Sequence, residues 1–164
     1  MVSSTPVAAR SVPEERCWED LAAGDRLRGP VVTITEAHLV AWAGLTGDFV
    51  PLRMDAHSAA SGRFDQRIAH GPLTLGLGLM AQAGYLANAI AWLGLTDLRA
   101  RVPVFIGDTV HPEAVVESAR TTHRPERGIW TLAYTILNQE SVTVMDFVTS
   151  LMVRRRPAPG ALAG

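Results

Sequence analysis

Two short segments in the middle of the chain hold the residues best suited to acid–base chemistry. The first contains Asp48 and Arg53, and the second is His70-Gly71-Pro72, at the start of an apolar stretch. A carboxylate such as that of Asp48 can serve as a general acid or base. The first backbone N–H groups of a helix lack partners within it, so the N–H of Gly71 is suited to stabilise a developing oxyanion. The same residues would also fit a surface Asp–Arg ion pair beside an ordinary helix start.

The composition of the chain excludes several classes of function. All 15 basic residues are arginines, so the chain has neither a Schiff-base lysine nor the lysine of a phosphate-binding loop. The formal net charge is −1 at pH 7, and no overall positive field favours nucleic acid or an anionic membrane. The single cysteine, Cys17, cannot form an internal disulfide, and no Cys/His spacing predicts a metal site. We expect a reducing, cytoplasmic location.

Residues 71–96 carry no charged side chain, and an uncharged run of this length can indicate a transmembrane helix. The run contains Pro72, several glycines, Gln82 and Asn88, and no arginine clusters flank it. These features favour a helix that is surrounded by protein on most sides. We expect this helix to span residues 73–93, with no membrane segment.

The remaining elements predict one early strand, short helices and then a run of antiparallel strands. We expect a strand at 30–34, a helix at 37–45 that Thr35 and His38 cap, a loop at 46–54, a helix at 56–63, and strands at 99–105, 109–119, 129–138 and 142–154. This order predicts an α+β fold in which one long helix lies against a curved sheet. The length of 164 residues fits one domain, at 14–156, between flexible tails at 1–13 and 157–164.

Four motifs, in this order along the chain, resemble the MaoC-like (R)-specific enoyl-CoA hydratase/dehydratase family. The family's catalytic loop is usually written G-D-x-N-P-[IVL]-H-x-D, and the chain has Gly47-Asp48-Phe49 and Pro51-Leu52 there. Its F-x3-I-x-H-G motif is matched by Phe64 and Ile68-Ala69-His70-Gly71, and flanking motifs are matched by 18–25 and 103–110. The resemblance implies a single hot-dog fold, with a long central helix wrapped by a curved antiparallel sheet. It also implies a homodimer joined edge to edge and no cofactor.

The resemblance assigns roles to individual residues. Asp48 matches the catalytic aspartate, and Gly71 matches the glycine whose N–H polarises the substrate carbonyl. His70 takes a structural or substrate-binding place beside it, and Asp55 caps the next helix. We also expect Val50 to border the substrate and an apolar pocket to form from residues that would otherwise be plain core, namely Trp42, Leu73, Leu77, Met80 and Trp92.

Two positions depart from the family pattern. Arg53 stands where the family has its catalytic histidine, and Val50 stands where it has asparagine. An arginine stays protonated at neutral pH and cannot act as a base, and the valine side chain forms no hydrogen bond. Loss of one acid–base partner typically costs about 10²–10⁴-fold in rate. We therefore expect poor hydration of ordinary enoyl thioesters, and we expect His57 to be a surface residue rather than a substitute.

Three functions remain open from the sequence. The first is an altered dehydratase of a β-hydroxy carbonyl or polyketide-like intermediate, with or without cyclisation by an internal hydroxyl, in which Asp48 transfers protons and Arg53 anchors an oxyanion. The second is a conventional acyl-thioester hydratase in which a water or another side chain takes over the role of the replaced residues. The third is a non-catalytic subunit that binds an acyl chain or forms a heteromer with an active homologue. In each case the expected partner is a small molecule or an acyl thioester, and neither nucleic acid nor a membrane.

Overall fold

A computed structural model describes residues 16–85 and 88–157, without the side chains of residues 80–85. The first half of the chain forms a 3₁₀ helix (Trp18–Asp20), strands β1 (Arg26–Arg28) and β2 (Val32–Thr33), and helices α1 (Glu36–Thr46), α2 (Pro51–Met54), α3 (Ala56–Ala60) and α4 (Gly71–Tyr85). The second half forms strands β3 (Ala89–Ala100), β4 (Thr109–Thr121), β5 (Arg127–Leu137) and β6 (Thr143–Arg154). The predicted tail at 1–13, and all of the predicted tail at 157–164 except Pro157, lie outside the described residues.

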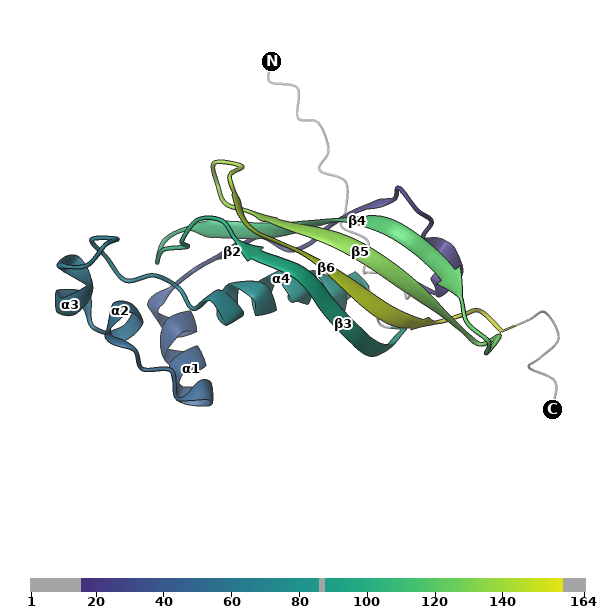
Figure 1. The fold of residues 1–164 in the computed structure, drawn as a ribbon, viewed down its shortest axis with the longest axis horizontal. Helices are drawn as coiled ribbons and strands as arrows, with labels where there is room; N and C mark the ends of the chain where they lie inside the picture. Colours follow the sequence, from purple (N-terminus) through teal and green to yellow (C-terminus); the bar gives the residue numbers. More distant parts are fainter. Residues whose placement is uncertain (1–15, 86–87, 158–164) are drawn as a thin grey trace, which may run out of the picture.

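The strands form one antiparallel sheet in the order β1-β4-β5-β6-β3, with β2 paired to β4. Figure 1 shows this sheet curving over α4, while α1, α2 and α3 lie beyond one end of it. Helix α4 lies against β4 and β5. The expected α+β arrangement of a long helix and a curved sheet is therefore confirmed.

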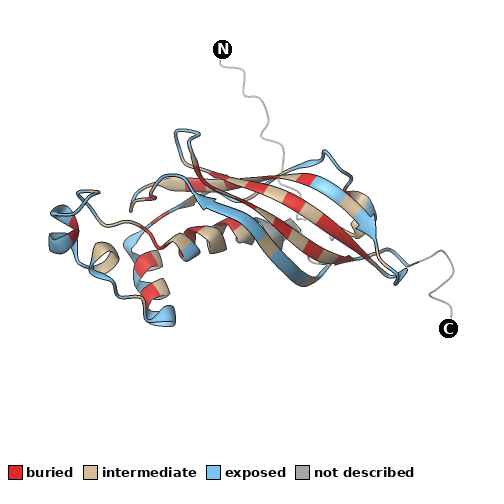
Figure 2. Cartoon of the chain, in the orientation of Figure 1, coloured by how far each residue is buried: buried red, intermediate tan, exposed pale blue. Residues whose placement is uncertain are grey.

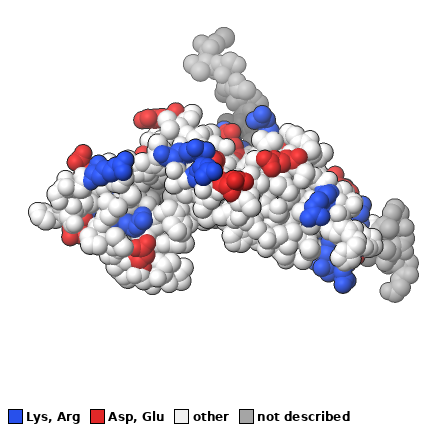
Figure 3. Space-filling model, in the orientation of Figure 1, with Lys and Arg blue, Asp and Glu red and all other residues white. Residues whose placement is uncertain are grey.

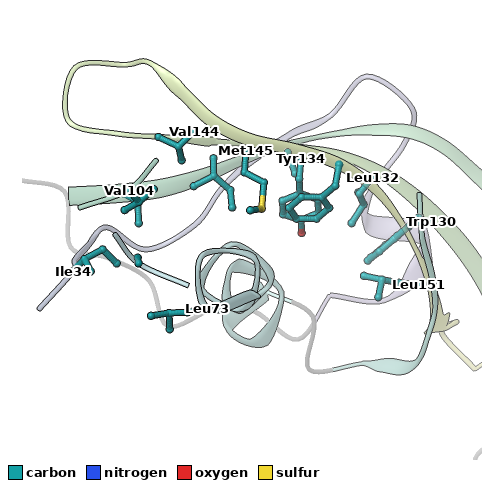
Figure 4. Close-up of a cluster of buried hydrophobic side chains, with 14 of the residues drawn as sticks. Ile34, Leu73, Val104, Trp130, Leu132, Tyr134, Val144, Met145 and Leu151 are labelled. Carbon is teal, nitrogen blue, oxygen red and sulfur yellow. The ribbon is translucent and has the colours of Figure 1, made fainter. Parts of the chain in front are cut away.

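The core fills the space between α4 and the concave face of the sheet. Buried and partly buried residues alternate along β4, β5 and β6, as Figure 2 shows by its bands of colour. The buried side chains of β5 are Ile129, Trp130, Leu132, Tyr134 and Ile136, and the Tyr134 ring stacks on Phe147 with 5.0 Å between centroids. Figure 4 shows side chains of the sheet directed toward the helix. Burial of each large apolar side chain contributes about 1.5–3 kcal/mol.

The predicted helix at 73–93 is wrong in its second half. Helix α4 ends at Tyr85, and the chain then forms the edge strand β3, whose Trp92 is 55% exposed. An uncharged apolar run has the same appearance in a buried helix and in a strand, so periodicity did not reveal the boundary. Within the described residues, no helix is both long and apolar enough to cross a bilayer.

Smaller differences from the sequence prediction have local causes. The segment 46–54 is not all loop, because Pro51 begins α2 at a position where its missing N–H costs no hydrogen bond. Strand β2 is shorter than the predicted 30–34, and the strand expected at 99–105 ends at Ala100, after which only Phe105 forms a bridge, to Ile68. The strands expected at 109–119, 129–138 and 142–154 are confirmed within a few residues.

Two glycine substitutions should change stability in opposite directions. A Cβ added at Gly128 would lie 2.2 Å from Trp18 Cδ1, whereas a Cβ at Gly44 in α1 would meet nothing within 4 Å. We expect Gly128→Ala to lower the free energy of unfolding by about 1–3 kcal/mol, because the whole indole ring must move. Gly44→Ala should raise it by about 0.5–1 kcal/mol through helix propensity. Urea unfolding of both variants measures this difference, and equal effects would contradict the packing at Trp18.

Candidate active site

The turn chemistry between α1 and α3 places Asp48 and Arg53. Gly47 ends α1 in the left-handed conformation (φ 77°), and its N–H donates to the carbonyl of Ala43 at 2.8 Å. This turn directs the chain into Asp48 and then into α2, whose last turn contains Arg53. The Asp55 carboxylate accepts hydrogen bonds from the first N–H groups of α3 at 2.9 and 3.0 Å, which confirms its expected capping role.

The Asp48 carboxylate lies between a guanidinium and an imidazole. Its Oδ2 is 3.6 Å from Arg53 Nε and 3.8 Å from His70 Nε2. His70 is fully buried, and its Nε2 lies 3.1 Å from the Asp48 carbonyl oxygen, so a proton on Nε2 would hold the backbone of Asp48. About a third of the Asp48 side chain (33%) stays exposed. Asp48 is therefore held from two sides and still open to a substrate.

Arg53 connects this carboxylate to the start of α4. Its Nη1 donates to the carbonyl oxygen of Ala69 at 2.9 Å, two residues before Gly71. As the first residue of α4, Gly71 has an N–H without a partner in the helix, and a Cβ built on Gly71 would meet nothing within 4 Å. Gly71 therefore borders open space on its Cα side, and its N–H is suited to donate to a carbonyl oxygen bound there.

A cleft of about 350 Å³ lies beside these groups. Arg53 and Gly71 line it together with Thr74 and two further arginines, Arg63 and Arg101. The rest of its lining is mainly apolar and comes from three parts of the chain, with Phe64, Ile68 and Ala69 before α4, Val102, Pro103 and Val104 after β3, and Val144 and Met145 in β6. Its shape and lining are typical of a site for an amphipathic small molecule.

Of the three residues predicted to be catalytic, Arg53 and Gly71 line the cleft, whereas Asp48 lies 3.6 Å from Arg53 Nε and is not itself a lining residue. Catalysis by these three residues stays a prediction. The structure does not place the predicted substrate-binding residues in the lining of the cleft. Leu73 and His70 are buried, Trp42 and Leu77 are partly buried against the core, and Val50 is 51% exposed. Contact of these five with a substrate stays a prediction. The side chain of Met80 lies outside the described residues.

Sequence reasoning missed Arg63 and Arg101 as residues of the cleft. Arg63 directly precedes the Phe64 of the second motif, which was the only signal for it. Arg101 follows β3 and pairs with Asp146, and its hydrogen bond lowers the pKa of the Asp146 carboxyl. His57 is exposed on α3, as expected. Among the described residues, no three His, Cys, Asp or Glu side chains gather in a way that could hold a metal ion.

Figure 3 shows basic and acidic side chains interspersed on the visible face of the molecule. The sequence of the chain also matches the model of one protein family. Residues 21–135 match the MaoC like domain. The chain belongs to this family. Members of the MaoC-like family include hydratases and dehydratases of CoA thioesters.

Three relatives show how similar the MaoC-like chain is in sequence to named proteins. It is 38% identical over 130 residues to the 3-hydroxybutyryl-CoA dehydratase of Methylorubrum extorquens, covering 79% of this chain and 80% of that protein. It is 37% identical over 105 residues to the (R)-specific enoyl-CoA hydratase of Aeromonas caviae, covering 63% and 74%. Protein MaoC of Klebsiella aerogenes is 33% identical over 114 residues, 68% of this chain, but the match spans only 34% of that longer protein.

Solved structures confirm the fold of the MaoC-like chain. The MaoC-like dehydratase of Rhodospirillum rubrum superposes with a TM-score of 0.77 at 27% identity, over 87% of this chain and 99% of that one. The double hot-dog protein Rv0216 of Mycobacterium tuberculosis gives a TM-score of 0.81 at 23% identity, over 91% of this chain and 48% of that one. The predicted hot-dog fold is thereby confirmed.

Proposed function

We propose that this chain is a hydro-lyase that removes water from a β-hydroxy carbonyl compound, such as a polyketide-like intermediate. The observation that carries the proposal is the Asp48 carboxylate, which remains partly exposed 3.6 Å from Arg53, a residue that lines one cleft together with Gly71. A carboxylate and an oxyanion donor are sufficient for a proton transfer next to a carbonyl. Membership of a family of hydratases and dehydratases supports the reaction type.

The proposed reaction moves one proton through Asp48. Its carboxylate removes the proton from the carbon next to the substrate carbonyl, and the electron pair moves onto the carbonyl oxygen, where the Gly71 N–H stabilises it. The pair returns to form the Cα–Cβ double bond as the Cβ–O bond breaks. Protonated Asp48 then gives its proton to the departing hydroxyl, which leaves as water. Addition of an internal hydroxyl to the same double bond, through the reverse steps, would close a ring.

Arg53 acts in this proposal as a fixed positive charge. Its Nε lies 3.6 Å from the Asp48 carboxylate, and its Nη1 donates to the carbonyl of Ala69, two residues before the oxyanion donor Gly71. It cannot replace the base of the usual site, because a guanidinium has no lone pair available at neutral pH. Substrates that lose water readily, because the product gains conjugation, therefore suit this site best. No cofactor takes part in these steps.

We propose that the chain forms a homodimer through the edge of β3. This strand has 12 residues, ends the sheet on one side and exposes Ile90, Trp92, Leu93 and Leu98. An unpaired, apolar edge of this length is a site for pairing with another strand. A heteromer with an active homologue is the alternative, and it would favour the non-catalytic function. Size-exclusion chromatography with light scattering of the purified chain distinguishes the two assemblies.

A comparison of two substrates tests the proposed function. We expect negligible hydration of crotonyl-CoA, because the partner acid–base groups of the usual site are replaced by Arg53 and Val50. We expect measurable dehydration of a β-hydroxyacyl thioester whose product is conjugated to a second carbonyl. Absorbance of the enoyl group follows both reactions. Robust turnover of crotonyl-CoA would favour the conventional hydratase, and no turnover of either substrate would favour the non-catalytic subunit.

A further inference from the structure

The charged residues that line the cleft next to the Asp48–Arg53 pair are all positive. Its lining includes three arginines, Arg53, Arg63 and Arg101, and none of its lining residues carries a carboxylate. Arg53 lies near Asp48, and Arg101 is paired with Asp146. Arg63 is exposed and has no acidic partner within the described part of the chain. The cleft therefore keeps a positive charge that no side chain of its own neutralises.

One nitrogen of the Arg53 guanidinium, Nη2, is available to donate to a ligand. Its Nη1 is bonded to the Ala69 carbonyl, and its buried Nε faces Asp48 Oδ2 at 3.6 Å, which is too long for a hydrogen bond. Its Nη2 bonds to no residue that the structure describes. Since Arg53 lines the cleft, Nη2 is the nitrogen left to meet a ligand. A guanidinium presents planar N–H donors whose geometry matches a carboxylate.

The rest of the cleft limits what that ligand can be. Its apolar lining, with Ile68, Val104, Val144 and Met145, fits hydrocarbon rather than a small inorganic anion. Arg53 is adjacent to Asp48, where the reacting carbons must lie, so the anion that it meets belongs near those carbons. A phosphate on a thioester carrier is many bonds away from them.

We propose that the acyl group taken by this site carries a carboxylate of its own, which pairs with Arg53 and is attracted by Arg63. The inference rests on the proposed function, because it concerns the same cleft. It names the substrate class more narrowly, as the thioester of a dicarboxylic acid. Replacement of the family's histidine by arginine then serves substrate selection as well as charge support.

Binding of two non-reacting thioesters tests this proposal without any catalysis. Succinyl and butyryl thioesters of N-acetylcysteamine have acyl chains of the same length, lack phosphate and differ in one carboxylate. Isothermal titration calorimetry should give a dissociation constant about 10–100-fold lower for the succinyl compound. Arg53→Gln should bring the two constants within about twofold, and the exposed variant Arg63→Gln should reduce their ratio. Arg120→Gln, an exposed arginine on β4, should leave the ratio unchanged.

The outcomes separate this proposal from its alternatives. Equal binding of the two compounds by the unmodified chain would overturn it, whatever the result of the activity assays. The same titrations with CoA thioesters show whether the arginines bind the phosphates of the carrier instead. A carrier phosphate is indicated if CoA tightens binding equally for both acyl groups and Arg63→Gln removes that gain. This result, together with equal binding of the two phosphate-free compounds, would overturn the proposal.

Discussion

Asp48→Asn should reduce dehydration of the conjugating β-hydroxyacyl thioester by about 10²–10⁴-fold in kcat. The amide has nearly the shape of the carboxylate, but it cannot accept the α-proton or return a proton to the leaving hydroxyl. The change should affect KM less than kcat, because the apolar lining and the arginines of the cleft remain. Steady-state kinetics of the purified variant measure both constants.

A matched variant shows whether the loss is specific to position 48. Asp55→Asn makes the same chemical change seven residues along the chain, and asparagine is as good a helix cap as aspartate. We expect Asp55→Asn to keep kcat within about threefold and Asp48→Asn to keep the thermal midpoint of the unmodified chain. A variant at position 48 that retained full turnover would remove the assigned role of Asp48.

Arg53→His combined with Val50→Asn should raise hydration of crotonyl-CoA by about 10²–10⁴-fold over the unmodified chain. Together these changes restore the two groups that the family uses to handle water and the α-proton. The structure accommodates the asparagine, because Val50 is 51% exposed and occupies the N-cap of α2 without a capping hydrogen bond. Asparagine is among the preferred residues at an N-cap. Initial rates at saturating thioester measure the gain.

The single variants are the controls for this double change. Val50→Asn alone should give little gain, because Arg53 would still lack a lone pair to accept a proton. Arg53→His alone should give a partial gain, because the water would not be oriented. If the double variant showed no increase while remaining folded, the cleft itself would be unsuited to crotonyl-CoA, and the two substitutions would not explain its exclusion.

The sequence predicted strands β4, β5 and β6 better than it predicted α4 or β3, and it did not indicate β1. Strands β4, β5 and β6 alternate between buried and partly buried positions, and a period of two is visible in the amino-acid pattern. The end of α4 and the start of β3 lie inside one uncharged run, where neither charge nor periodicity marks a boundary. Pro51 is compatible with a loop and with the first turn of a helix, so α2 was missed.

Motifs carry the three residues expected to be catalytic, whose roles stay predictions, but no motif indicated the lining of the cleft. Asp48 and Gly71 are 23 positions apart, and the resemblance alone placed them in one site. The lining of the cleft comes from segments on both sides of α4 and from β6, and its composition depends on tertiary packing. Leu73 lies in the core, whereas Val104 and Met145 lie in the core and also border the cleft. All three are apolar, so residue type alone does not show which of them lines the cleft.

Hydrogen–deuterium exchange at the α-carbon is the most direct test of the account. A saturated acyl thioester without a β-hydroxyl cannot lose water, so any deuterium that it takes up from D₂O reports removal of the α-proton alone. NMR spectra should show uptake catalysed by the unmodified chain and by Asp55→Asn, and only the uncatalysed rate with Asp48→Asn. Uptake at the full rate by Asp48→Asn would show that another group removes the proton.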